Sequence, residues 1–148
     1  MPDKRLKHRP RDPAQPSRTQ WAAQFLVAAE LVRRKYIVSF TMGNTTPMAD
    51  LMVGLPNGEQ FWVDVKGVVK HNSVLQAEKP KLKGLHYIVV NVADEKREED
   101  EFYILTQEEF NDLIRRYATA QPKDRKPGFT FKYVREGHFR DNWETLPH

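Results

Sequence analysis

The chain has 148 residues, 39% hydrophobic and 30% charged, a balance typical of a soluble globular protein with one compact domain. Its net charge of +4 mildly favours a polyanionic partner, and the absence of cysteine excludes disulfides and thiolate metal sites. It contains no apolar run of membrane-spanning length and no signal-peptide core near its start, so a cytoplasmic protein without a membrane partner is expected.

The first residues, 1–16, are rich in proline, lysine and arginine and have no apolar cluster that could pack in a core. This composition predicts a flexible basic N-terminal arm. Two interpretations remain open: the arm lies along nucleic-acid phosphates, or it only increases solubility. Residues 17–148 are expected to form a single domain.

A helix is predicted over Ser17–Lys35, with Ser17 and Gln20 at the two positions of a capping box. Apolar residues recur at helical spacing along this segment and predict that one stripe of the helix is buried. Glu30 is expected near the edge of this stripe. The stripe consists of Trp21, Phe25, Ala28, Ala29 and Val32.

Three strands are expected after this helix. The first is Tyr36–Met42, followed by a turn over Gly43–Pro47. The next two are Ala49–Val53 and Gln60–Gly67, and the Asn57-Gly58 pair between them is a strong hairpin signal.

Charged residues interrupt both strands of this predicted hairpin. Side chains alternate along a strand, so Trp62, Asp64 and Lys66 share one face and the intervening apolar residues share the other. Asp50 is similarly out of place beside the apolar residues that follow it. Charges in such strands are costly to bury, which makes Asp50, Asp64 and Lys66 the candidate functional residues.

The second half of the chain begins with a polar segment, Lys70–Gly84, for which a short helix, a loop and a flap all remain open. His86–Val92 is typical of a central strand buried on both faces. Asp94–Glu101 is expected to be a solvated hairpin tip rather than a metal site, and Phe102–Leu105 is its partner strand.

A second helix is predicted to begin at Thr106, with Glu109 completing a capping box. Further on, Phe129–Val134 is expected as an edge strand and Asp141–Trp143 as the start of a helical turn. Together the elements predict an α/β fold, a mixed sheet with helices on its faces. The buried stripe of the second helix is expected to consist of Phe110, Leu113, Ile114 and Tyr117.

Two carboxylates on adjacent strands can bind one divalent cation, and Mg²⁺ prefers such oxygen ligands while it retains several waters. Asp50 and Asp64 are the expected ligands, and the peptide carbonyl of Val65 can complete the set. Lys66 can orient or deprotonate a water and offset developing negative charge. Glu30, carried by the preceding helix, is a further candidate ligand.

Glu30 on a helix, Asp50 in a strand and Asp64-Val65-Lys66 in the next strand resemble the PD-(D/E)XK nuclease superfamily, which includes restriction endonucleases and archaeal-type Holliday junction resolvases. The resemblance implies a restriction endonuclease-like αβββαβ core and a Mg²⁺-dependent endonuclease, in which Mn²⁺ substitutes for Mg²⁺. It also implies that Asp50 and Asp64 are metal ligands and that Lys66 is the catalytic lysine. Ala49 stands where many members have proline.

The resemblance and the basic residues near the motif imply a nucleic-acid substrate, DNA rather than RNA. A lysine-rich stretch follows the second acidic strand, and its alternative interpretation is a solvated loop. Gln76 is the candidate for a glutamine that some members carry after the motif. The expected nucleic-acid-binding residues are Lys70, Gln76, Lys79, Lys81 and Lys83.

Alternatives to a nuclease remain. A domain of this size has one site, so cleavage of both strands of a duplex requires a homodimer or sequential nicking. A different class is a nucleic-acid-binding or interaction module without turnover on the same fold. In a third interpretation, Asp64 and Lys66 are a solvated pair without function on an edge strand. His71-Asn72 resembles a fragment of an HNH nuclease motif, but the rest of that motif is absent.

Overall fold

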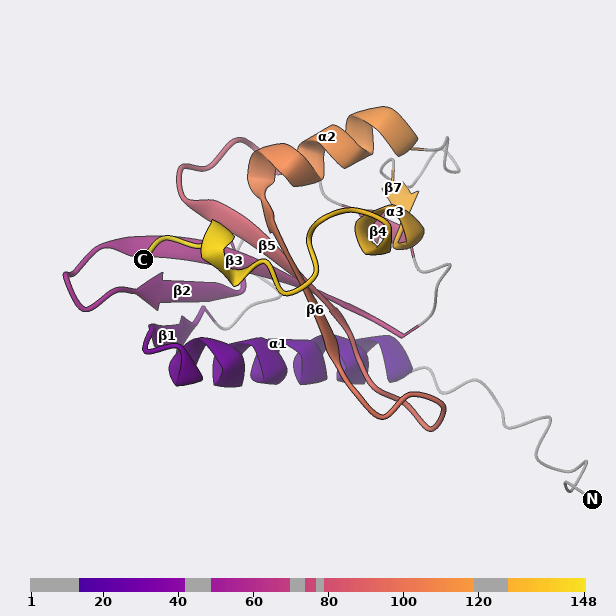
Figure 1. Cartoon of the computed structure of the whole chain (residues 1–148), viewed down its shortest axis with the longest axis horizontal. Coiled ribbons are helices and arrows are strands. Elements are labelled where there is room, and N and C mark those ends of the chain that lie inside the picture. The colour runs from indigo at the N-terminus through magenta and orange to yellow at the C-terminus, as the bar shows by residue number, and fades with distance from the viewer. Residues whose placement is uncertain (1–13, 42–48, 70–73, 77–78, 119–127) are drawn as a thin grey trace, which may run out of the picture.

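A five-stranded mixed sheet lies between two helices, α1 on one face and α2 on the other (Figure 1). The computed structural model describes residues 14–41, 49–69, 74–76, 79–118 and 128–148. In chain order the elements are α1 (Gln15–Arg33), β1 (Ile37–Phe40), β2 (Leu51–Gly54), β3 (Gln60–Val68), β4 (Val74–Gln76), β5 (Leu85–Asn91), β6 (Glu101–Thr106), α2 (Gln107–Tyr117), β7 (Gly128–Thr130), α3 (Lys132–Arg135) and the 3₁₀ turn η2 (Trp143–Thr145).

The strand order in the main sheet is β1-β2-β3-β5-β6. Antiparallel pairing joins β1 to β2, β2 to β3 and β5 to β6, whereas β3 and β5 are parallel. The predicted mixed α/β sheet with flanking helices is therefore confirmed. The connection from β3 to β5 contains β4, which pairs with β7 in a separate two-stranded sheet, and its described residues include no helix.

Alternation along β3 divides the interior into two layers, as the sequence predicted. Phe61, Val63 and Val65 pack under α1 in one buried cluster. Trp62 and the buried Asp64 belong to the opposite face, where β5 and β6 contribute Tyr87 and other buried residues beneath α2 and β7. The charged residues of β3 thus lie on the α2 side of the sheet.

The start of α1 differs from the prediction. The helix begins at Gln15 with Ala14 as its N-cap and proline in its first turn, and no side chain caps it, so the predicted Ser17–Gln20 capping box is wrong. Proline favours this start because it needs no hydrogen-bond partner for its nitrogen in the first turn. The amide of Gln20 instead binds the backbone of β3.

The buried stripe of α1 is also different. Of the predicted stripe Ala28 is buried, but Phe25 and Val32 are each 59% exposed and Trp21 is 37% exposed. Ala23 and Val27, which were not part of the prediction, are fully buried. Two apolar stripes run along this helix, and the one with the small residue Ala23 can approach β3 most closely. Trp21 and Phe25 of the predicted stripe instead form an exposed aromatic group with Phe40 of β1, in which Phe25 contacts both other rings.

Most of the other local predictions are confirmed. Gly58 adopts a φ of 90° in the β2–β3 turn, which favours glycine. Every residue of β5 is buried, and Thr106 and Glu109 form the capping box of α2. Residues 94–100 form the tip of the β5–β6 hairpin, whereas Glu101, predicted as part of the tip, begins β6. Tyr117, expected in the buried stripe of α2, is 37% exposed.

The C-terminal predictions are only partly correct. Gly128–Thr130 is a strand, but Lys132–Arg135 forms the short helix α3 instead of continuing it. A 3₁₀ turn begins at Trp143, close to its predicted position. The arm was predicted over residues 1–16, but its last two residues belong to the first turn of α1, so its predicted end is wrong. Residues 1–13 and the predicted turn at 43–47 lie outside the described residues.

Candidate active site: an acidic pair with two lysines

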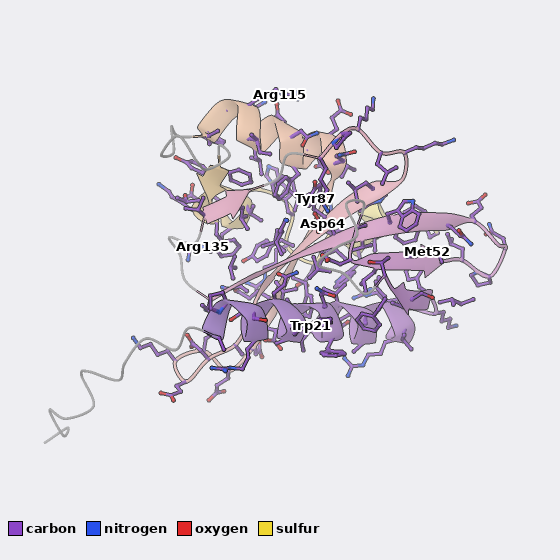
Figure 2. All side chains as sticks on the ribbon, turned by 180° about the vertical axis from the view of Figure 1, so that it is seen from behind. Trp21, Met52, Asp64, Tyr87, Arg115 and Arg135 are labelled. Atoms are coloured by element: carbon purple, nitrogen blue, oxygen red, sulfur yellow. The ribbon has the colours of Figure 1, made fainter. Side chains whose placement is uncertain are left out.

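The two predicted acids lie opposite each other at the end of the β2–β3 pairing. Leu51 pairs with Val63, so the same register brings Asp50 to Asp64, and the two carboxyl groups are hydrogen-bonded. An Asp50 carboxylate oxygen also accepts a 2.8 Å hydrogen bond from the Val65 amide. Asp64 lies at the centre of the sheet with 2% of its surface exposed (Figure 2). The edge-strand interpretation is therefore wrong, because β3 has a neighbour on each side.

A side chain of α1 binds the backbone of β3 next to Asp50. The Asp50 amide donates to the Val63 carbonyl at 3.1 Å, and the next backbone groups of β3 that point to the same side belong to Val65 and Gly67. The Gln20 Nε2 donates to the Val65 carbonyl at 2.7 Å, and its Oε1 accepts from the Gly67 amide at 3.1 Å. Gln20 was missed as a site residue because its spacing from Ser17 matched a capping box.

Two ammonium groups reach the buried Asp64 carboxylate. The Lys66 Nζ lies 3.4 Å from Asp64 Oδ2, and the Lys79 Nζ lies 2.9 Å from the same oxygen. Their side chains are 25% and 22% exposed, so both are largely shielded from water. The structure thus brings Asp50, Asp64 and Lys66 together as predicted, and it adds Lys79, which was expected only as a nucleic-acid contact.

The electrostatic environment separates the two acids. Burial, together with the hydrogen bond and the negative charge of Asp64, raises the pKa of Asp50 to about 7 from its ordinary 3.8. Burial opposes ionisation of Asp64 as well, but Lys66, the hydrogen bond to Asp50 and Lys79 together lower the pKa of that carboxyl. Below about pH 7 the pair therefore holds a proton on Asp50 and a negative charge on Asp64.

Replacement of Asp50 with asparagine is expected to stabilise the fold at pH 8 by about 1–2 kcal/mol. A raised carboxyl pKa means that the folded state binds the proton more tightly, so this group's contribution to stability is lost as pH rises from about 4 through about 7. A carboxyl pKa raised from 3.8 to about 7 corresponds to about 4 kcal/mol of lost stability once the group is ionised. The partial exposure of Asp50 reduces this cost to the expected value. Asp64, with its lowered pKa, contributes in the opposite sense, losing stability only below about pH 4.

Urea unfolding at pH 5 and pH 8 measures this effect. The stabilisation by Asp50→Asn should be full at pH 8 and less than half as large at pH 5, because asparagine mimics the protonated acid and the loss of stability begins near pH 4. Glu59→Gln, in the exposed β2–β3 turn, removes the same charge and serves as the control. An equal effect of Asp50→Asn at both pH values would contradict the assigned proton.

Tyr87 is a further polar residue of this face. It pairs in register with Asp64 across β3 and β5, and its ring stacks on Phe110 at a centroid distance of 4.0 Å. Burial and the charge of Asp64 both raise the pKa of its phenol. Its hydroxyl is buried and has no hydrogen-bond partner among the described residues.

Glu30 lies away from the acidic pair. Its carboxylate contacts Arg33 at 2.8 Å and Arg34 at 3.9 Å within the last turn of α1. The helix residue beside the acidic strand is Gln20, and ten residues of helix correspond to about 15 Å. The structure therefore brings Gln20, not Glu30, to the site.

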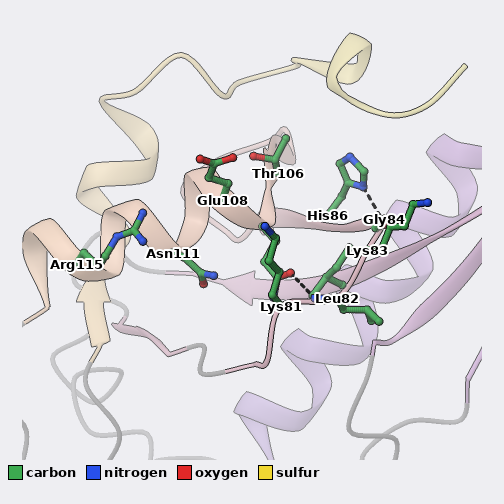
Figure 3. Close-up of a pocket in the computed structure, with 11 residues that line it drawn as sticks. Lys81, Leu82, Lys83, Gly84, His86, Thr106, Glu108, Asn111 and Arg115 are labelled. Atoms are coloured by element: carbon green, nitrogen blue, oxygen red, sulfur yellow. Dashed lines mark hydrogen bonds between the residues drawn. The ribbon is translucent and has the colours of Figure 1, made fainter.

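The predicted nucleic-acid contacts divide into separate groups. Lys81, Lys83 and Arg115 line a pocket of about 410 Å³ at the start of α2, with Asn111 and Glu108 (Figure 3). Lys79 faces Asp64 instead. Lys70 and the side chain of Gln76 lie outside the described residues.

The donor atoms at the acidic pair are those that a hard divalent cation takes: two carboxylates and the Val65 carbonyl, which can accept a second contact besides Gln20. Within the described ranges no group of three or more histidine, cysteine or acidic side chains lies close enough to hold a metal ion. A cation here would thus rely on the two aspartates, the carbonyl and waters or substrate oxygens, an arrangement that suits Mg²⁺.

No protein-family model, curated protein or solved structure matches the chain. In the part of the chain that the structure describes, no helix has the length and apolar character needed to cross a membrane.

Proposed function

We propose that this protein is a metal-dependent nuclease that hydrolyses DNA phosphodiester bonds with an activated water, on a fold of the PD-(D/E)XK type. The observation that supports this most is the convergence of Asp50, Asp64 and Lys66 on a buried face of the sheet. Buried, interacting acids with divergent pKa values are characteristic of functional sites. The order helix, three antiparallel strands and a parallel β5 also agrees with an αβββαβ core, although the described residues of the β3–β5 connection contain β4 and not the second helix of that core.

Each residue has a defined part in this proposal. Asp50, Asp64 and the Val65 carbonyl would hold Mg²⁺ or Mn²⁺, and Lys66 would hold the attacking water by a hydrogen bond and stabilise negative charge on the phosphate. The bound cation would supply Lewis-acid chemistry, activating water and stabilising the leaving oxygen. The basic pocket at Lys81, Lys83 and Arg115 would bind flanking backbone phosphates.

Cleavage of plasmid and oligonucleotide DNA with Mg²⁺, with Mn²⁺ and with EDTA tests the proposal. Cation-dependent cleavage is expected, together with calorimetric cation binding that disappears in the Asp50→Asn, Asp64→Asn double variant. Supercoiled plasmid also reveals whether one strand or both are cut, and sedimentation would identify a homodimer. Absence of both cleavage and cation binding, with DNA present, would contradict the nuclease.

A second candidate is a nucleic-acid-binding module without turnover. Two contacts favour it, because each occupies an oxygen that a cation would use. Lys79 forms an ion pair with Asp64 Oδ2, and Gln20 donates a hydrogen bond to the Val65 carbonyl. Such a module should bind DNA with salt-dependent affinity, and Asp64→Asn should leave that affinity unchanged or increase it.

A further inference from the structure

Lys79 contacts Asp64 more closely than the lysine of the Asp64-Val65-Lys66 motif does. Its Nζ lies 2.9 Å from Asp64 Oδ2, against 3.4 Å for Lys66. Asp64 is nearly inaccessible to water, with 2% of its surface exposed. A charge pair at this separation and in this environment is much stronger than an exposed surface pair. The Lys79 ammonium is therefore a principal counter-ion of the buried carboxylate.

The two lysines are held differently. Lys66 lies within β3, where it pairs with Val89 of β5, so its backbone is fixed by the central sheet. Lys79 lies at the start of residues 79–84, which form neither helix nor strand. Displacement of Lys79 from Asp64 would thus require no break in the main sheet.

Gln107, the first residue of α2, holds the backbone on which Lys79 stands. Its Oε1 accepts a 2.9 Å hydrogen bond from the Leu82 amide, and its Nε2 donates to the Pro80 carbonyl at 3.1 Å and toward the Lys79 carbonyl at 3.5 Å. Gln107 is 6% exposed, and the capping box at Thr106 fixes the turn from which it projects. One buried amide therefore binds three backbone groups of the 79–84 connection.

We propose that Lys79 is an internal cation that competes with a divalent metal ion for Asp64, and that Gln107 is the positioning residue that holds it there. This inference rests on the proposed function, because it assumes that the acidic pair binds a cation. A divalent ion that takes the same Asp64 oxygen must displace the ammonium or share the carboxylate with it. The displaced ammonium then becomes available to a phosphate oxygen of the substrate.

Calorimetric titration of the full chain with MnCl₂ tests this proposal. Lys79→Gln, which keeps much of the side-chain length without the charge, is expected to bind Mn²⁺ about tenfold more tightly than the wild type, because one competing positive charge is removed. Lys79→Arg should shift the affinity much less. Lys96→Gln removes an exposed lysine charge at the tip of the β5–β6 hairpin, away from both proposed binding sites, and should leave the affinity unchanged.

Gln107→Ala provides an independent variant, because it leaves every charge in place. It should also tighten Mn²⁺ binding, by less than Lys79→Gln, since it only loosens the connection. Thermal melts establish that each variant is folded. Equal Mn²⁺ affinity for the wild type and Lys79→Gln would overturn this inference and leave the nuclease intact, whereas no binding by any variant, even with DNA present, would overturn both.

Discussion

Replacement of Lys66 with methionine is expected to reduce DNA cleavage by about 10²–10⁴-fold while cation binding is retained or tightened. Methionine keeps most of the side-chain length, so the change removes mainly the ammonium that lies 3.4 Å from Asp64. Groups that position water and stabilise charge in a phosphate transition state contribute rate factors of this size. The measurement is the single-turnover cleavage rate, with Mn²⁺ binding by calorimetry on the same preparation.

Lys83→Met is the matched control, because Lys83 is an exposed lysine that lines the basic pocket. It should weaken DNA binding in a salt-dependent way, with a smaller loss of single-turnover rate at saturating DNA. A Lys66→Met protein that cleaves at the wild-type rate would remove Lys66 from the catalytic machinery. Loss of cation binding in Lys66→Met would indicate a structural defect at the acidic pair instead.

Replacement of Gly67 with alanine is expected to destabilise the fold by about 3 kcal/mol, the upper part of the range for overpacked sites. A Cβ at this position would lie 2.8 Å from the Thr19 carbonyl oxygen and 3.0 Å from the Ala23 Cβ. Both are parts of α1 with little freedom to move, so the helix must shift away from β3. The shift would also strain the Gln20 contacts to Val65 and Gly67.

Gly54→Ala is the control for this substitution, because Gly54 also lies in a strand but its Cβ would meet nothing closer than the Ile37 side chain at 3.7 Å. Its effect should be within about 0.5 kcal/mol of zero, or slightly stabilising, since glycine is unfavourable in strands. Urea unfolding of the two variants gives the comparison. Equal stability of Gly67→Ala and the wild type would mean that α1 does not pack against β3 at this point.

The main local features of the fold could be predicted because each rests on residues close together in sequence. Asn57-Gly58 favours a tight turn, Thr106 and Glu109 satisfy backbone groups of their own helix, and the apolar β5 run is compatible only with burial. The acidic pair followed from the same reasoning. Once the hairpin register is set by its turn, Asp50 and Asp64 must face each other on one side of the sheet.

The errors arose where the choice depends on packing between distant segments. Two apolar stripes on α1 satisfy helical spacing equally well, and only the close approach at Gly67 selects the one that contains Ala23. That choice sets which polar residues of α1 meet β3, so Gln20 reaches the site and Glu30 pairs with arginines. Sequence periodicity could not distinguish them, because both lie on the same helix.

The sequence by itself therefore determined the mixed α/β class, the hairpin and the facing of Asp50, Asp64 and Lys66, because these follow from strand alternation and turn chemistry. Only the tertiary structure decided what surrounds them. Lys79 stands fifteen residues after Asp64 in a stretch without a periodic pattern, and it reaches that carboxylate because Gln107, still further along the chain, binds its backbone. Contacts of this kind depend on how separate elements pack, which local sequence patterns do not encode.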